Sequence, residues 1–231
     1  MRKSIIECGD HQVSLYLPDG AEGSVPMVYS CMFGDEAEET AEWLFEKEGP
    51  AARALFAAIS GGNWDDQLSP WPAPRAFKGG DDFGGGAAGF LEELTGGIMP
   101  ETEKAAAAMG VMPEYSAIAG YSLAGLFAVY AVLESDAFRR GASASGSLWF
   151  DGFTDHMEKW SGTAPEKFYF SLGNKEKNTK NQRMATVEER TLKAETMMRG
   201  FGAETVFESN EGGHFSEPER RTARGIRWML G

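Results

Sequence analysis

The chain has 231 residues, and its 22 Lys and Arg against 35 Asp and Glu leave a formal net charge of −13. Hydrophobic residues make up 42% and charged residues 25%, values typical of a globular protein. The length predicts one domain, residues 1–231, with a sizeable core. The charge excludes nucleic-acid binding through a general basic surface and disfavours binding to anionic membranes.

The predicted elements begin with an antiparallel hairpin, with strands over 3–8 and 12–17 around the turn Gly9-Asp10. Strands and helices then alternate. Further strands are predicted over 25–32, 54–60, 115–119, 142–145, 168–172 and 205–208, and helices over 37–47, 87–94, 100–109, 126–133, 151–160, 182–199 and 218–229. This order predicts an α/β fold, a three-layer α/β/α sandwich with a mostly parallel central sheet.

A long irregular segment, residues 61–85, interrupts this alternation. Its prolines, as in Ser69-Pro70-Trp71-Pro72, fit neither a helix nor a central strand. A loop of this length in a compact domain is usually functional or disordered. Its aromatic residues, which are Trp64, Trp71, Phe77 and Phe83, favour packing over disorder.

Neither a secretion signal nor a membrane span is expected. The apolar run near the N-terminus is too short for a signal peptide, and no stretch reaches the roughly 18 apolar residues of a span. Cys8 and Cys31 each lie in an apolar, strand-like segment. A disulfide between them is possible, but two reduced thiols are favoured, which predicts a cytoplasmic location.

The sharpest motif is Gly120-Tyr121-Ser122-Leu123-Ala124-Gly125, which follows a predicted strand and opens a predicted helix. This context is typical of a nucleophile elbow, a tight turn that presents a reactive serine and needs small flanking residues. Gly120 meets that need, while Ala124 stands where glycine is usual. The alternative interpretation is a serine that caps the following helix.

A nucleophilic serine needs a histidine base later in the chain. His11 precedes Ser122, and His156 lies in a polar stretch that indicates a solvated helix residue. His214 follows the last predicted strand in the glycine-rich loop Gly212-Gly213-His214. Such a loop can reach the carboxyl edge of the sheet, so His214 is the predicted base.

The acid that orients the base should follow a strand between serine and histidine. Glu176 comes directly after the strand predicted over 168–172, and Asp151 and Asp155 are the alternatives. The backbone N–H of Leu123 is the expected oxyanion donor, and Phe33, after an earlier strand, is chosen as the second donor.

Together these motifs resemble the esterase branch of the α/β-hydrolase superfamily, which includes esterase D-like, feruloyl-esterase-like and enterochelin-esterase-like proteins. The resemblance runs from about residue 25 to the C-terminus. It implies the α/β-hydrolase fold and carboxylester hydrolysis by a Ser122–His214–Glu176 triad through an acyl-enzyme, without metal or cofactor. The motifs that carry it, besides the elbow, are Asn63-Trp64-Asp65-Asp66, Ser69-Pro70-Trp71-Pro72-Ala73-Pro74, Phe83-Gly84-Gly85-Gly86, Ser147-Leu148-Trp149, Ser171-Leu172-Gly173-Asn174-Lys175-Glu176 and Gly213-His214.

The resemblance also predicts that the 61–85 loop borders the active site. Trp64, Trp71, Trp149 and Tyr121 are then candidates for contacting the substrate, although core packing is an equal alternative for each tryptophan. The expected partner is a small or medium-sized ester, neutral or cationic because the chain is acidic. Two alternatives remain open: an acyltransferase on the same triad, and a non-catalytic binding protein on a hydrolase scaffold. The oligomeric state is not predicted.

Overall fold

The computed structural model describes residues 1–46, 49–76 and 79–231. In these residues eight strands form one sheet in the order β1-β2-β4-β3-β5-β6-β7-β8. The β1–β2 and β2–β4 pairs are antiparallel, and every later pair is parallel, which confirms the predicted hairpin and mostly parallel sheet. The strands are β1 (Arg2–Cys8), β2 (His11–Leu17), β3 (Gly23–Cys31), β4 (Leu55–Gly61), β5 (Val111–Tyr121), β6 (Arg140–Ala144), β7 (Lys167–Gly173) and β8 (Glu204–Asn210).

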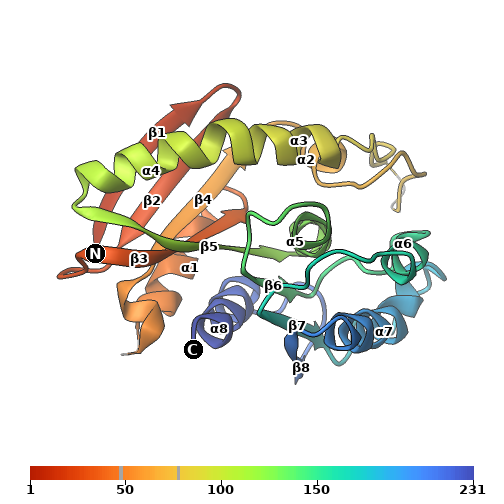
Figure 1. Cartoon of the computed structure of the whole chain (residues 1–231). Helices are drawn as coiled ribbons and strands as arrows, with labels where there is room; N and C mark the ends of the chain where they lie inside the picture. The colour runs from red at the N-terminus through yellow and green to blue at the C-terminus, as the bar shows by residue number, and fades with distance from the viewer. Residues whose placement is uncertain (47–48, 77–78) are drawn as a thin grey trace.

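Helices cover both faces of this sheet, so the molecule has the three predicted layers (Figure 1). One face packs against α1 (Glu36–Phe45) and α8 (Pro218–Leu230). The other packs against α3 (Ala87–Glu93), α4 (Met99–Ala108), α5 (Leu123–Glu134), α6 (Phe153–Glu158) and α7 (Val187–Gly200). The short helical segments are η1 (Pro50–Arg53), α2 (Trp64–Gln67), η2 (Leu94–Ile98) and η3 (Met184–Thr186).

Strand β4 shows why the central strands read as continuous apolar runs. Leu55, Ala57 and Ile59 enter the core on one side of the sheet, and Phe56 and Ala58 enter the core on the other. A strand covered on both faces has no polar side, so its sequence loses the alternation of a surface strand.

The helix break expected between 87–94 and 100–109 is wrong. The π-helical turn η2 joins α3 directly to α4, so that Ala87 to Ala108 is helical throughout. The pair Gly96-Gly97 weakens a helix by itself, but Leu94 and Ile98 on the same turn are buried in the core. Packing of these two side chains outweighs the low helix propensity of glycine.

The 61–85 segment is ordered by packing in its described residues, while Phe77 and Lys78, and Lys47 of the helix predicted over 37–47, lie outside them. Ala73 and Phe83 pair as an isolated bridge, and the loop then folds onto Asp66. A Cβ atom on Gly84 would lie 1.9 Å from Asp66 Oδ1, so a larger residue here would displace the Asp66 side chain. Among the described residues no helix is long and apolar enough to cross a membrane, and both cysteines are free.

Candidate active site

Ser122 lies in a strained turn between β5 and α5, with φ 56° and ψ −121°. A non-glycine residue in this conformation costs energy and marks a constrained site. The turn is tight, since a Cβ atom on Gly120 would lie 2.2 Å from the carbonyl oxygen of Ala124. The side chain of Ser122 makes no capping hydrogen bond to α5. The alternative interpretation of Ser122 as a capping serine is therefore wrong.

The structure brings Ser122, His214 and Glu176 into one hydrogen-bonded chain. The distance between Ser122 Oγ and His214 Nε2 is 2.9 Å, and that between His214 Nδ1 and Glu176 Oε2 is 2.8 Å. With the imidazole proton on Nδ1, this nitrogen donates to Glu176 and Ser122 donates to Nε2. The three residues follow β5, β8 and β7 respectively. They meet because the carboxyl ends of parallel strands share one edge of the sheet.

Glu176 is held in a closed setting, with its side chain only 4% exposed. Burial acts to raise the pKa of Glu176, but the hydrogen bonds from His214, from Ser145 Oγ and from the backbone N–H of Gly173 outweigh it and hold the pKa below its ordinary value. Ser145 Oγ and Gly173 N both donate to Oε1 over 2.7 Å, so Oε2 remains for His214. The carboxylate is thus ionised at neutral pH and aimed at the imidazole.

The other sequence candidates for acid and base lie elsewhere. The carboxylate of Asp151 pairs with Arg183 at 2.8 Å, and Asp155 is an exposed residue of α6. His156 of α6 pairs with Glu134 of α5 at 2.9 Å. His11 is buried and contacts Gln67 and Glu93. None of these groups contacts Ser122 within the described part of the chain.

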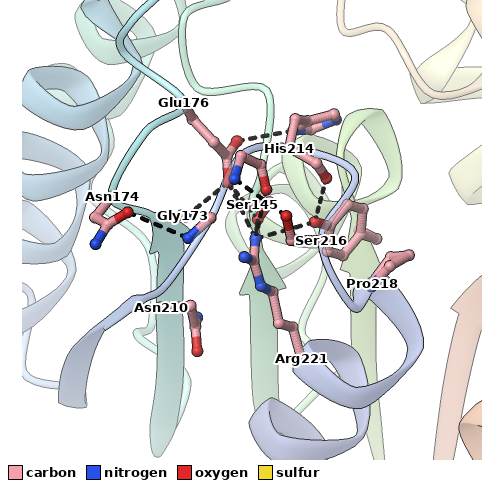
Figure 2. A network of polar contacts seen from close by, with 12 residues as sticks. Ser145, Gly173, Asn174, Glu176, Asn210, His214, Ser216, Pro218 and Arg221 are labelled. Atoms are coloured by element: carbon pink, nitrogen blue, oxygen red, sulfur yellow. Dashed lines mark hydrogen bonds and ion pairs between the residues drawn. The ribbon is translucent and has the colours of Figure 1, made fainter.

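Sequence reasoning missed Arg221, a buried arginine of α8 whose Nη1 lies 3.4 Å from Glu176 Oε1 (Figure 2). The sequence does contain a signal for this buried arginine. Arg221 precedes Gly225 and Met229 by one and two helical turns, and both of these residues are buried on the sheet-facing side of α8. An arginine in the apolar stripe of an amphipathic helix needs a buried partner.

The backbone N–H of Leu123 has no hydrogen-bond acceptor in the described residues, which leaves it available to an oxyanion at the start of α5. Phe33 differs. Burial raises the pKa of the Glu36 carboxyl, and a hydrogen bond from the backbone N–H of Phe33 offsets part of this rise. The Phe33 N–H therefore faces a carboxylate, while the Phe33 ring stacks on Trp64 with centroids 4.6 Å apart.

Two cavities meet at Ser122 and His214, and Trp64 lines both of them. The first, of about 160 Å³, is walled mainly by Phe33, Glu36, Tyr121, Phe215, Glu219 and Thr222. The second, of about 140 Å³, is walled mainly by Asp65, Arg75, Phe83, Leu123, Trp149 and Met184. Several of these residues come from the 61–85 segment, which therefore lies directly beside Ser122.

Of the predicted substrate contacts, Trp64, Trp149 and Tyr121 line these cavities. Trp71 lines neither of them: its Nε1–H donates to the carbonyl of Asp151 over 3.1 Å, and its ring packs edge-on against Phe150. For Trp71, the structure therefore favours the alternative of core packing over substrate contact. In the residues that the structure describes, no group of three or more His, Cys, Asp or Glu is placed to hold a metal ion.

The sheet order and the strand–turn–helix that presents Ser122 define an α/β-hydrolase fold. Solved structures agree. An IroE-like serine hydrolase from Shewanella oneidensis is 19% identical with a TM-score of 0.80, covering 98% of this chain and 79% of that one. The siderophore hydrolase EstA from Aspergillus nidulans is 19% identical with a TM-score of 0.75, covering 99% and 93%. At such identities the likeness establishes the fold.

A relative in sequence is the uncharacterized protein YbbA of Bacillus subtilis, which is 26% identical over 249 residues and covers 100% of this chain and 98% of its own. No protein-family model matches the chain.

Proposed function

We propose that this protein is a serine hydrolase of carboxylic esters, with Ser122 as nucleophile, His214 as base and Glu176 as the orienting acid. The observation that carries the proposal is the unbroken hydrogen-bonded chain from Ser122 Oγ to the ionised Glu176 carboxylate. A serine, a base within hydrogen-bond reach and a third group that orients the base are what acyl transfer requires.

The proposed reaction has two similar halves. Ser122 Oγ attacks the ester carbonyl carbon while His214 Nε2 takes the hydroxyl proton, and Glu176 stabilises the imidazolium. The N–H of Leu123 binds the oxyanion of the tetrahedral intermediate, with the N–H of Phe33 as the proposed second donor once Glu36 yields it. Collapse of the intermediate breaks the ester C–O bond. The leaving alcohol takes the proton from His214, and water then attacks the acyl-enzyme by the same route.

The two cavities support a small or medium-sized ester. Both border Ser122, His214 and Trp64, so one can take the acyl group and the other the alcohol. We propose substrate contacts for Trp64, Trp149 and Tyr121, but not for Trp71. We further propose that residues 1–231 form one domain, and the cytoplasmic location stays a prediction that the free cysteines support.

The test is turnover of p-nitrophenyl acetate by the wild type and by Ser122→Ala, with Ser161→Ala, an exposed serine, as the matched control. Loss of the nucleophile should lower kcat by about 10⁴-fold or more, and the control should leave it unchanged. Unchanged turnover in Ser122→Ala would overturn the proposal.

Two further measurements separate the alternatives. Stoichiometric labelling of Ser122 by a fluorophosphonate contradicts a non-catalytic binding protein. Product analysis with an added alcohol distinguishes hydrolysis from acyl transfer. A panel of aliphatic and aromatic esters and one siderophore ester, included because a structural neighbour is named a siderophore hydrolase, then ranks the substrates.

A further inference from the structure

Arg221 is the largest side chain among the fully buried residues of the described chain, at 2% exposure. Taking a guanidinium out of water is costly, and a buried ion pair adds little stability over apolar packing. Moreover, the Nε–H of Arg221 has no acceptor in the described residues. A contribution to the stability of the core therefore does not by itself account for an arginine at this position.

The guanidinium contacts both loops that hold the proposed acid and base (Figure 2). Nη2 donates to the carbonyl of Glu211 over 2.7 Å, and Nη1 lies 3.2 Å from the carbonyl of Gly213. Nη1 also lies 3.4 Å from Glu176 Oε1 and 3.2 Å from Ser145 Oγ. One side chain thus links the turn after β7 to the loop after β8.

A second link runs through Tyr121. Its hydroxyl donates to the carbonyl of His214 over 2.6 Å and accepts from Arg221 Nη1 at 3.4 Å. The backbone on both sides of the imidazole is therefore tied, directly or through Tyr121, to one guanidinium. The Glu176 oxygen that faces Arg221 is Oε1, so that Oε2 alone is left to meet His214.

The loops are also joined without Arg221. Asn174 N donates to Asn210 O over 2.8 Å, Gly212 N donates to Asn174 Oδ1 over 3.2 Å, and Lys175 N donates to Gly212 O over 3.0 Å. These bonds hold the bases of the two loops. Removing the guanidinium should therefore loosen the part of the loop that bears His214 while the fold persists.

We propose that Arg221 is a positioning residue. It sets the distance and orientation between Glu176 and His214 and keeps the Glu176 carboxylate negatively charged. This inference rests on the proposed function, because it assigns Arg221 a part in that same site. The positive charge of Arg221, whose Nη1 lies 3.4 Å from Glu176 Oε1, opposes protonation of that carboxylate. Loss of the charge should therefore move the acidic limb of the pH profile to higher pH.

The experiment compares Arg221→Met, which keeps length without charge, Arg221→Lys, which keeps charge without the planar fork, and Arg53→Met as control. Arg53 is exposed and pairs with Glu114 near the start of β5, whereas Ser122 follows the end of that strand. Each variant is measured for kcat/KM on p-nitrophenyl acetate across pH, for fluorophosphonate labelling rate, and for the low-field proton signal of the His214 Nδ1–H. Thermal unfolding checks that each is folded.

We expect Arg221→Met to lose about 10- to 100-fold in kcat/KM and in labelling rate, as for a misplaced catalytic group, with the acidic limb at higher pH and the low-field signal weakened. Arg221→Lys should restore the pH limb but only part of the rate, because one ammonium cannot reach both loops. Arg53→Met should match the wild type.

A folded Arg221→Met with wild-type rate, pH profile and proton signal overturns the inference. Should Arg221→Met not fold, the folded Arg221→Lys decides: wild-type rates in that variant overturn it equally, and a partial loss supports it. Failure of the proposed function is distinguishable, since Ser122→Ala would then keep full turnover while the Arg221 variants show no common pattern.

Discussion

Glu176→Gln replaces the orienting carboxylate by an amide of the same shape, and the structure dictates how that amide must sit. Oε1 receives hydrogen bonds from Gly173 N and Ser145 Oγ. Because these are donors, the amide oxygen takes that side and the NH₂ group faces His214 Nδ1 over the 2.8 Å now bridged by Oε2. Nδ1 must then accept, which places the imidazole proton on Nε2, the atom that faces Ser122.

In that tautomer His214 cannot take the proton of Ser122. The corresponding carboxylate-to-amide change in a serine protease triad lowers kcat by about 10⁴-fold, or about 5.4 kcal/mol at 1.36 kcal/mol for each factor of ten. We expect a similar loss in kcat of p-nitrophenyl acetate hydrolysis. Glu189→Gln, at an exposed position of α7, is the control. A folded Glu176→Gln within tenfold of wild type would refute the assignment of Glu176 as the acid.

The wild type and Glu176→Gln also test how the free energy of unfolding depends on pH. Because the folded pKa of Glu176 lies below its ordinary 4.5, its ionisation favours folding above that value, and this contribution is lost as the pH falls through the folded pKa. Urea unfolding should therefore show a difference between wild type and Glu176→Gln that shrinks below about pH 4.5. A difference that grows on acidification contradicts the depressed pKa.

Three further predictions concern the turn, the tryptophans and the charge of the cavity. Gly120→Ala should destabilise the protein by about 1–3 kcal/mol in urea unfolding, whereas Gly89→Ala, an exposed helical site with nothing within 4 Å of the added Cβ, should stabilise it by about 0.5–1 kcal/mol. Equal effects would contradict the crowded turn. Trp64→Ala should raise KM for the best ester about tenfold, because the ring lines both cavities. Trp71→Ala should lose about 2 kcal/mol in thermal unfolding and leave KM unchanged; a raised KM would show that Trp71 contacts the substrate. An ester with an ammonium group should be hydrolysed with higher kcat/KM than a carboxylate ester of the same size, and Glu36→Gln should reduce that ratio about tenfold. Because burial raises the pKa of Glu36 above 4.5, the preference of the wild type for the ammonium ester should weaken already in mild acid. The absence of such a preference at every pH would refute the role of the Glu36 charge in substrate choice.

Local signals predicted the elements well where short-range chemistry decides them. The turn Gly9-Asp10 and the alternating residues around it are enough to specify a hairpin. The tight turn at Ser122 likewise follows from Gly120 and from the strand and helix on either side. His214 and Glu176 were predicted because a parallel sheet collects the ends of its strands at one edge, and the structure indeed brings them together. Their catalytic roles stay a prediction.

Long-range packing decided the features that sequence reasoning missed. Gly96-Gly97 signals a helix end locally, but burial of Leu94 and Ile98 carries the helix through. Trp64 and Trp71 stand in the same loop among similar residues, and only the path of the chain places one beside Ser122 and the other against Phe150.

By itself, then, the amino-acid sequence determined the order of strands and helices, the strained serine turn and the two loops that could supply a base and an acid. These follow from residue types and spacings within a few positions of one another. Only the tertiary structure decided which oxygen of Glu176 meets His214 and that Arg221 of the last helix lies behind both loops. Such contacts join residues far apart in the chain, and their hydrogen bonds depend on distances that only the packed sheet and helices set.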